Sequence, residues 1–586
     1  MTRQAGRRDT LKLLTAAALT GAIPRLGRAQ ATQDLYDLPR AGNLRVLHQT
    51  DTHAQLLPVL FREPGVNIGL GEAAGRPPHL VGEAFLRHYG VPAGSARAHA
   101  FTCLDFEEAA HRYGALGGFA QLKTLIDRLR AQAGPGNTLL LDGGDMWQGS
   151  WTAHASQGAA LVQLANRLGV DAMTAHFEFT YGEAAVRRNL AAFRGQFIAQ
   201  NVFLTDEAAF NGAESFDAAS GRVFRPYVME ERGGRRIAVI GQCFPYQPIA
   251  HPRRFVENWT FGIREAELQA VVDQVRQQER ADAVLLLSHN GMDVDLKLAG
   301  RVRGIDVILG GHTHDATPVP SVVENAGGRT LVTNAGSNGK FLGVLDLDVG
   351  SGRVNGLRYT LLPVFSNLLP ADAETTAEIA ALRRPDEAML SERLAEAGEL
   401  LYRRGNFSGT MDQVICDALR EELDAQIALS PGFRWGPSLL PGDTITMEHV
   451  LAQTAITYPD VYVQEMTGAQ VRTILEDVCD NLFNPDPYVQ QGGDMVRVGG
   501  LGYACDPAQP IGRRISDLRL EDGTLLEAEK TYRVAGWASV NLPQEGRPVW
   551  EVVAAHLRRR KVVRPGRQGE VRLIGLAGNP GLLGPS

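Results

Sequence analysis

Five short apolar segments of this chain are each followed directly by Asp or His residues. The segments and the residues that follow them are 44–47 with Asp51 and His53, 139–141 with Asp145, 170–173 with His176, 284–287 with His289, and 305–309 with His312 and His314. Open α/β sheets bind ligands at the carboxyl ends of their strands. We therefore expect the five loops to bring two carboxylates and five imidazoles to one rim of an α/β fold.

This set of side chains favours a metal site. Oxygen and nitrogen donors without thiolate suit Mn, Fe or Zn better than copper(I) or an iron–sulfur cluster. Asp145 is the natural bridge between two ions, because a carboxylate has two oxygens to share and the preceding glycines allow close approach. A single His after a strand is more often a hydrogen-bonded loop residue, but five such clusters in order favour a two-metal hydrolase. Glu178, in the loop of His176, is not expected to bind a metal directly.

The motifs resemble those of the calcineurin-like metallophosphoesterases, in the branch that contains the 5'-nucleotidases. The family pattern of D-x-H, G-D, G-N-H-E/D, a lone His and G-H-x-H matches Asp51/His53, Gly144/Asp145, 175–178, His289 and His312/His314. The resemblance implies one ion held by Asp51, His53, Asp145 and His314. It implies a second ion held by Asp145, His176, His289 and His312.

The third motif departs from that family pattern. His176 stands in place of the Asn ligand, Phe177 in place of a catalytic His, and Thr180 in place of the Asp that partners this His. Phe177 cannot protonate a leaving group, so the leaving group should need little protonation. This run, 176–182, is similar to that of the SoxB-type thiosulfohydrolases of bacterial thiosulfate oxidation.

The SoxB resemblance implies a substrate and its contacts. The expected reaction releases sulfate from a cysteine-S-thiosulfonate on a SoxYZ-type carrier protein and leaves a persulfide. The expected cofactors are two divalent ions, with Mn²⁺ the family's metal and Zn or Fe also compatible, and no side chain is assigned a catalytic role beyond the metal-held hydroxide. Arg404, Asn406 and Arg434 match positions at which the family's second domain grips the substrate.

Two other functions remain open at this point. One is a periplasmic 5'-nucleotidase or related nucleotide phosphohydrolase. The aromatic and Asn positions that such enzymes use around the nucleobase are Thr457 and Pro459 here, although Tyr458 could stack if the register slipped by one. The other is a metal-dependent module that only binds the carrier, which the full set of seven ligands disfavours.

The chain divides into four expected parts. Residues 1–29 are predicted to be a twin-arginine signal peptide with Arg7-Arg8 before a short apolar run, which implies a periplasmic protein, with an uncleaved N-terminal anchor as the alternative. Residues 41–365 are expected to form the dinuclear metal domain, residues 366–400 a linker helix, and residues 401–575 a 5'-nucleotidase-type substrate domain. The resemblance implies a four-layer α/β/β/α sandwich for the first domain and an α/β fold for the last.

Two further segments carry expectations. A long stretch between residues 55 and 113 forms either a rim over the site or a docking surface for a partner, or is an insertion without a role. The Gly- and Pro-rich tail after Gly575 is predicted to be disordered.

Composition narrows the function further. A chain of 586 residues with a net charge of −7 and no long Lys/Arg run interleaved with aromatics is a multidomain protein for which nucleic acid is not an expected partner. No membrane span is expected in the mature chain.

The five widely spaced cysteines form neither a disulfide framework nor a zinc knuckle and are expected to be buried, with Cys479–Cys505 as one conceivable bridge.

Overall fold

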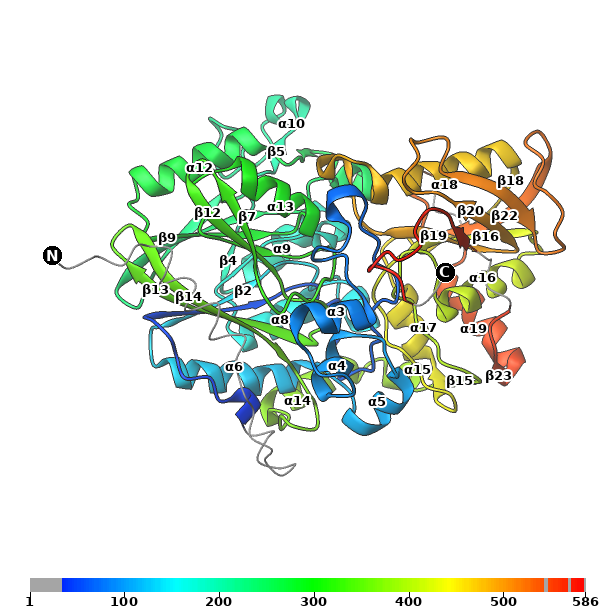
Figure 1. Cartoon of the computed structure of the whole chain (residues 1–586), viewed down its shortest axis with the longest axis horizontal. Coiled ribbons are helices and arrows are strands. Elements are labelled where there is room, and N and C mark those ends of the chain that lie inside the picture. The colour runs from blue at the N-terminus through cyan, green and yellow to red at the C-terminus, as the bar shows by residue number, and fades with distance from the viewer. Residues whose placement is uncertain (1–33, 542–545, 567–570, 584–586) are drawn as a thin grey trace.

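The computed structural model describes residues 34–541, 546–566 and 571–583, and it contains two domains that lie side by side (Figure 1). The predicted signal peptide, residues 1–29, lies outside the described residues. Within the described ranges, no helix combines the length and apolar character needed to cross a membrane.

The first domain contains two six-stranded mixed sheets. The first sheet has the order β14 (Arg353–Pro363), β13 (Phe341–Gly350), β1 (Leu44–Gln49), β2 (Thr138–Asp142), β3 (Ala172–Met173), β4 (Gln196–Phe197). The second has the order β11 (Ser321–Asn325), β12 (Gly328–Asn334), β10 (Val307–Gly310), β9 (Ala283–Ser288), β7 (Arg235–Gln242), β6 (Tyr227–Arg232). β1 to β4 are parallel to one another, as are β7, β9, β10 and β12. The parallel strands bring the loops after β1, β2, β3, β9 and β10 to the same end of the domain.

The two sheets pack face to face and are covered by helices outside. Fully buried side chains such as Val46, Leu141, Leu285 and Leu309 fill the space between the sheets. Helices α6 (Phe119–Ala133), α8 (Ala159–Leu168) and α14 (Ala373–Arg383) pack on the first sheet, and α12 (Glu265–Gln277) and α13 (Met292–Arg301) on the second. The predicted α/β/β/α sandwich is therefore confirmed.

The amphipathic spacing of two of these helices explains how they pack. On α6 the apolar residues that recur at helical spacing are buried, and the same is true of α12. These positions are Phe119, Leu122, Leu125, Ile126 and Leu129 on α6, and Leu268, Val271, Val272 and Val275 on α12.

The second domain is built around a four-stranded sheet and two three-stranded ones. The sheets have the orders β18 (Val461–Thr467), β22 (Thr531–Trp537), β16 (Ile427–Gly432), β19 (Asp494–Gly499); β17 (Thr444–Thr446), β15 (Arg393–Ala397), β23 (Val562–Val563); and β21 (Ile515–Leu520), β20 (Leu501–Cys505), β24 (Val571–Leu573). Helices α16 (Thr410–Glu422), α17 (Met447–Thr454), α18 (Gly468–Phe483) and α19 (Val549–Arg560) cover them. The range 366–400 is only partly helical: α14 and α15 (Glu387–Leu390) are followed by strand β15 of this domain.

Shorter elements complete the chain. They are η1 (Asp34–Tyr36), α7 (Trp151–Ala155), η3 (Phe177–Tyr181), α9 (Glu183–Ala192), β5 (Phe203–Leu204), α10 (Asp206–Phe210), α11 (Gln247–Ala250), η4 (Arg253–Phe255), β8 (Trp259–Thr260) and η5 (Pro487–Val489).

The long stretch after the first metal loop folds into short helices at the domain boundary (Figure 1). They are η2 (Gly71–Ala73), α3 (Gly82–Tyr89), α4 (Ala96–Phe101) and α5 (Phe106–Tyr113). The buried Lys340 ammonium donates to Glu63 at 2.5 Å, and His79 contacts Asp293 of α13 at 3.1 Å. Toward the second domain, the Ile68 N–H donates to the Asn406 side chain at 2.9 Å. This insertion therefore bonds to both domains.

The tail after Gly575 is ordered up to Leu583, contrary to the prediction of disorder. The Leu583 N–H donates to the Gly65 carbonyl at 3.0 Å, and the Asn579 side chain donates to the Gly69 carbonyl at 3.0 Å. Its glycines and Pro580 allow it to follow the insertion closely. The prediction was wrong because composition alone does not reveal a partner about 500 residues away.

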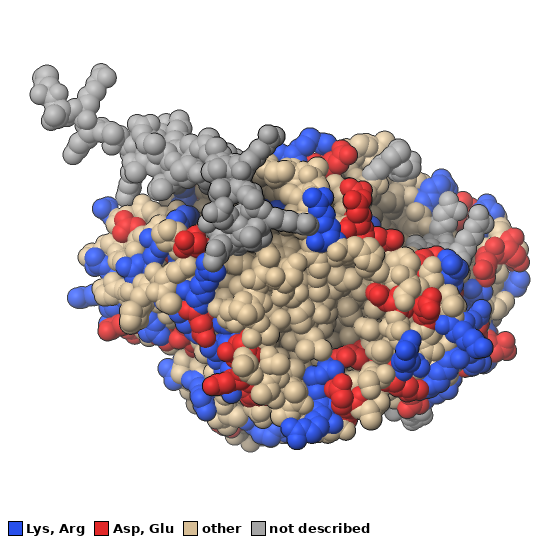
Figure 2. All heavy atoms as spheres, turned by 90° about the horizontal axis from the view of Figure 1, so that it is seen from below, with Lys and Arg blue, Asp and Glu red and all other residues tan. Residues whose placement is uncertain are grey.

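The cysteines and the charged surface complete the description. All five cysteines are buried and unpaired, and the Cys479 and Cys505 sulfurs lie 3.7 Å apart. On the face shown in Figure 2, Lys and Arg alternate with Asp and Glu around a central zone of uncharged residues.

Candidate metal centre

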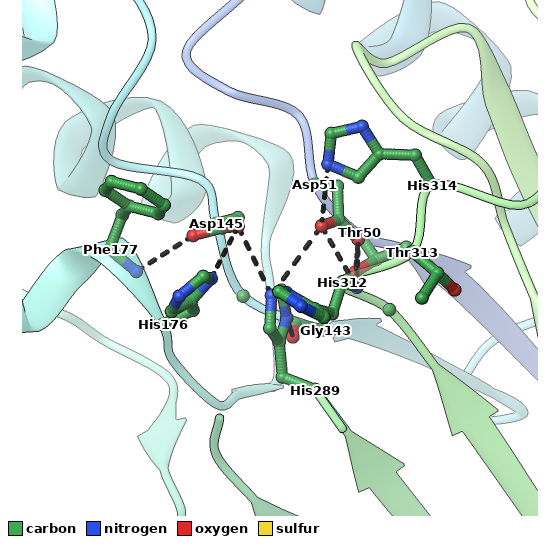
Figure 3. Close-up of polar contacts among 12 residues, drawn as sticks. Thr50, Asp51, Gly143, Asp145, His176, Phe177, His289, His312, Thr313 and His314 are labelled. Atoms are coloured by element: carbon green, nitrogen blue, oxygen red, sulfur yellow. Dashed lines mark hydrogen bonds and ion pairs between the residues drawn. The ribbon is translucent and has the colours of Figure 1, made fainter. Parts of the chain in front are cut away.

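The structure brings all seven predicted ligands together at the carboxyl ends of the parallel strands. Figure 3 shows Asp51, Asp145, His176, His289, His312 and His314. The donor atoms of the seven ligands form two groups, and within each group all atoms lie within 4.8 Å of one another. The first cluster is Asp51, His53, Asp145 and His314. The second cluster is Asp145, His176, His289 and His312. These two groups are the same as the two ligand sets that the family motifs imply, and Asp145 belongs to both. That they bind metal ions stays a prediction.

Asp145 is central because one of its oxygens faces three imidazoles. Its Oδ2 lies 3.0 Å from His176 Nδ1, 3.2 Å from His289 Nε2 and 3.7 Å from His53 Nε2. Asp51 Oδ1 lies 3.3 Å from His314 Nε2. The two carboxylates thus lie between the imidazoles of the two clusters, as bridging and terminal ligands would.

The donor set fits two cations. His53 Nε2 and His314 Nε2 face each other at 3.0 Å although each ring is at least 97% buried. The buried His289 Nε2 lies 3.2 Å from Asp145 Oδ2 but makes no well-aligned hydrogen bond. Buried imidazole nitrogens are normally satisfied, and cations placed between these nitrogens and the carboxylates would satisfy them. Nitrogen and oxygen donors of this kind suit Mn, Fe or Zn.

The protonation of the imidazoles agrees with ligand binding. Burial lowers the pKa of His53, His176, His312 and His314, so these rings are neutral at pH 7. Burial also acts to lower the pKa of His289, but the charges of Asp51 and Asp145 outweigh it and raise the value to about 9. The neutral ring is the form that binds a metal. Four of the five rings are therefore ready to accept a cation, and the fifth would release a proton.

Strained backbone is concentrated in these loops. Five candidate ligands have the positive φ angles that L-residues rarely adopt: Asp51 (50°), His53 (46°), Asp145 (57°), His312 (71°) and His314 (59°). Each such residue costs on the order of 1–3 kcal/mol, and such strain clusters at functional sites. Gly311 permits a close approach, because a Cβ there would lie 2.3 Å from Thr50 Oγ1. The loops thus adopt strained backbone conformations that bring the ligand side chains together, and this strain lowers their local stability.

Glu178 organises two of the loops, and both of its oxygens accept backbone N–H groups. Its carboxylate accepts the N–H groups of His176 at 2.8 Å and Asp145 at 3.3 Å on one oxygen. The other oxygen accepts those of Met146 at 2.7 Å and Trp147 at 3.2 Å. A fully buried carboxylate that binds four backbone donors holds the second and third loops together.

The outer nitrogens of the imidazoles have different partners. His289 Nδ1 donates to the Gly143 carbonyl at 2.6 Å, and His53 Nδ1 lies 3.3 Å from the Gln148 carbonyl. His176 Nε2 instead lies 2.9 Å from the ring of His251, and His312 Nε2 lies 3.1 Å from the Gln491 carbonyl of the second domain. Such outer contacts fix the ring orientation and tautomer of metal ligands.

Phe177 is covered by aromatic side chains of the second domain. Its ring lies edge-on to Trp435, with centroids 5.3 Å apart, and Trp435 stacks on His53 at 5.0 Å. The Phe177 N–H donates to Asp145 Oδ1 at 2.8 Å. Sequence reasoning missed Trp435 and His251, because neither lies in a motif. The position of Phe177 therefore offers apolar surface and no proton donor.

Arg404 and Arg434 reach the metal loop, whereas Asn406 does not bond to it. The Arg434 guanidinium donates to the His312 carbonyl at 2.8 Å and the Thr313 carbonyl at 3.3 Å. Arg404 donates to the Thr313 carbonyl at 3.1 Å, and its buried Nε has no partner. The Asn406 amide is engaged by Ile68 and by Asp494. Two guanidinium groups are thus close to the fifth metal loop.

A cavity of about 30 Å³ lies beside these groups. It is bordered by Arg404, His314 and Asp315 from the two domains, and by insertion residues including Glu63, Asn67 and Tyr89. The insertion therefore forms part of the rim of the site, one of the alternatives that the sequence left open.

Known proteins are similar to this chain in sequence and in fold. Residues 396–546 match the family described as the 5'-nucleotidase C-terminal domain. The Bacillus subtilis trifunctional nucleotide phosphoesterase protein YfkN is 26% identical over 71% of this chain, but the match spans only 30% of that protein. The structure of a 5'-nucleotidase precursor from Thermus thermophilus has 24% identity and a TM-score of 0.70, over 91% of this chain and 99% of that one.

The fold and the site define a calcineurin-like metallophosphoesterase. The structure of the Thermus thermophilus sulfate thiohydrolase SoxB, solved in complex with glycerol, is 37% identical to this chain, with a TM-score of 0.85. The alignment covers 92% of this chain and 98% of that one. The chain belongs to the 5'-nucleotidase branch of the metallophosphoesterases, and its resemblance to the SoxB-type thiosulfohydrolases is confirmed.

Proposed function

We propose that this protein is a periplasmic metal-dependent hydrolase that releases sulfate from a cysteine-S-thiosulfonate on a SoxYZ-type carrier protein. The observation that carries the proposal is Phe177, which lies beside Asp145 and is packed against Trp435 where the phosphoesterase pattern has a proton-donating His. A persulfide leaves without protonation far more readily than an alkoxide does, so a site without an acid suits this substrate. The similarity to the Thermus SoxB supports the same substrate class.

The residues of the chain have separate tasks in this reaction. Asp51, His53, Asp145 and His314 would hold one cation, and Asp145, His176, His289 and His312 the other. When bound, two divalent cations, for which Mn²⁺ is the expected metal, supply a water of lowered pKa and positive charge for the oxyanion. Overall, water adds to the terminal sulfone sulfur, the S–S bond breaks, sulfate departs, and the sulfane sulfur stays on the carrier cysteine with the electron pair.

Arg404 and Arg434 would hold the sulfonate. A guanidinium group can donate two parallel hydrogen bonds to two oxygens of a sulfonate or of a phosphate. Arg434 is fixed by the carbonyls of His312 and Thr313, and the Nε of Arg404 is buried without a partner beside the cavity. The buried rings of Phe177 and Trp435 would exclude water from one side of the site.

A nucleotide phosphohydrolase is the second candidate, because the C-terminal family and YfkN belong to that activity class. Tyr458, which could have stacked on a nucleobase, is 2% exposed, and its hydroxyl contacts His251 at 3.0 Å. A side chain held in this way is not free to stack on a base, which favours the thiosulfonate.

The deciding experiment offers both substrates to the manganese-loaded protein. We expect sulfate from a carrier charged with thiosulfonate and no phosphate from AMP or a UDP-sugar, measured by ion chromatography in parallel reactions. Phosphate from the nucleotides with no sulfate from the carrier would assign the phosphohydrolase activity instead. If the protein bound the carrier and two metal ions but released neither sulfate nor phosphate, it would be a binding module.

Restoring the missing acid sharpens the assignment. Phe177→His combined with Thr180→Asp rebuilds the phosphoesterase pair, and general acid catalysis contributes typically about 10²–10⁴-fold. We expect phosphate release from a nucleotide to rise by at least about tenfold while sulfate release does not rise. Phe177→Leu serves as the control, because it changes the packing without adding an acid. A gain in sulfate release by the double variant would show that the leaving group does need protonation.

A further inference from the structure

A line of hydrogen bonds leads from the second cluster into the second domain. The Nδ1 of His176 faces Asp145, while its Nε2 lies 2.9 Å from His251 Nε2. The Nδ1 of His251 lies 3.0 Å from the hydroxyl of Tyr458. His176 and His251 belong to the first domain, and Tyr458 precedes β18 of the second. The line therefore crosses the boundary between the domains.

The tautomers along this line are determined by the metal site. If Nδ1 of His176 binds a cation, the ring proton is on Nε2. That N–H can donate only to an unprotonated Nε2 of His251, which puts the His251 proton on Nδ1. This proton then points at the Tyr458 oxygen. One consistent set of donors and acceptors thus connects the ligand His176 with Tyr458.

Water cannot replace His251 or Tyr458 in these hydrogen bonds. His176, His251 and Tyr458 are only 4%, 3% and 2% exposed. The ring of Phe177 packs edge-on against His251 with centroids 4.4 Å apart and excludes solvent from that side. Removing one partner from a buried pair leaves a polar group unsatisfied. The hydrogen bonds are therefore expected to influence the ligand as well as the packing.

A second contact of the same kind supports the pattern. His312, also in the second cluster, bonds through Nε2 to the Gln491 carbonyl at 3.1 Å. The next residue, Gly492, has a φ of +72°, and a Cβ there would lie 2.4 Å from His312 Nε2. The second domain thus approaches two imidazoles of this cluster closely.

We propose that His251 and Tyr458 are positioning residues for the second ion, and that they couple its affinity to the docking of the second domain. The inference depends on the metal-binding role proposed for His176. Partners of metal-binding imidazoles orient the ring, and their loss typically lowers metal affinity or activity by about 10–100-fold. Coupling is reciprocal, so the second ion also tightens the contact between the domains.

The test measures metal binding rather than catalysis. The metal-free full-length mature protein is titrated with Mn²⁺, bound metal is counted after gel filtration, and the paired ions are followed by their exchange-coupled paramagnetic resonance signal. The variants are Tyr458→Phe, His251→Leu and His251→Gln. Tyr503→Phe is the matched control, since Tyr503 is a buried tyrosine of the same domain whose hydroxyl has no partner.

We expect the parent and Tyr503→Phe to bind two ions with equal affinities. Tyr458→Phe and His251→Leu should retain the first ion, bind the second about 10–100-fold more weakly, and lose the coupled signal at limiting metal. His251→Gln, which keeps an acceptor near the His176 Nε2, should recover part of the affinity. Thermal unfolding of the metal-free proteins separates misfolding from weakened binding.

The outcomes separate this inference from the metal assignment. A parent that binds fewer than two ions would overturn both. A parent with two ions and a Tyr458→Phe variant with unchanged second-ion affinity would overturn the positioning role alone. Equal loss in Tyr458→Phe and Tyr503→Phe would show a general effect of packing and would also overturn it.

Discussion

The two clusters share Asp145 but are supported by different parts of the chain. In the first cluster, Asp51 accepts the Thr50 hydroxyl at 2.5 Å and the His312 N–H, and His53 bonds to the Gln148 carbonyl. All these partners belong to the first domain. In the second cluster, His176 and His312 reach Tyr458 and Gln491 of the second domain, directly or through His251.

The first domain alone therefore supplies the hydrogen bonds of the first cluster, but not those of the second. The hydrogen bonds of the first cluster need only the strand-end loops of the sandwich. Those of the second need both domains in contact. We therefore expect the first site to be the tighter one when the domains are loosened by mutation or by mild denaturant.

Asp145→Asn removes the feature that the clusters share and should have the largest effect. The variant should bind neither ion tightly, and sulfate release should fall by roughly 10³-fold or more, because metal ions supply several kcal/mol of transition-state stabilisation. Metal analysis and a sulfate assay check this. Asp348→Asn, an exposed position on β13, is the control. Retention of two tightly bound ions would remove Asp145 from its bridging role.

Glu178→Gln should weaken both clusters together, because its four backbone contacts hold loops that carry ligands of each. The amide replaces one accepting oxygen by a donor that faces N–H groups, and we expect unfolding to become easier by about 3 kcal/mol. Denaturant unfolding of the metal-free protein measures this. If only the affinity of one site changed and stability did not, Glu178 would act on an ion rather than on the backbone.

His53→Ala and His176→Ala form a matched pair of variants. They test directly whether only the second cluster is linked to the second domain. Each should reduce the metal content from two ions to one. Only His176→Ala should speed amide hydrogen exchange around residues 455–460, since only this variant breaks the line to Tyr458. The opposite pattern of exchange would show that the first cluster, through the stacking of Trp435 on His53, is the one linked to the second domain.

Asp295→Asn should have the smallest effect, limited to the pH dependence of stability. Burial raises the pKa of Asp295 from 3.8 to about 7. The folded protein thus keeps a proton that the unfolded chain loses near pH 4, and the stability it contributes is present below pH 4 and lost as the pH rises to about 7. The variant should unfold about 2 °C higher than the parent at pH 8 and equally at pH 4. Parallel pH profiles of Tm for the two proteins would contradict this.

The sequence predicted the site better than its surroundings. The seven ligands follow apolar strands, and parallel strands bring such loops to one edge, so Asp51 and His314 could be placed together although 263 positions separate them in the numbering. His251, Tyr458 and Trp435 lack any such signal. His251 follows the short helix α11 rather than a strand, and Tyr458 and Trp435 approach from loops of the second domain, whose position depends on domain docking. The helices of the insertion did carry a signal, since Phe85 and Tyr89 are four residues apart and pack together at 4.6 Å.

The contact between the insertion and the tail has a consequence for how the molecule is assembled. The Gly65 carbonyl receives its N–H from Leu583, so this hydrogen bond forms only after residue 583 has been synthesised. A growing polypeptide can complete its sandwich before this contact between the insertion and residues 576–583 forms. Loss of this contact between the insertion and the tail is therefore expected to be among the first events when the protein begins to unfold.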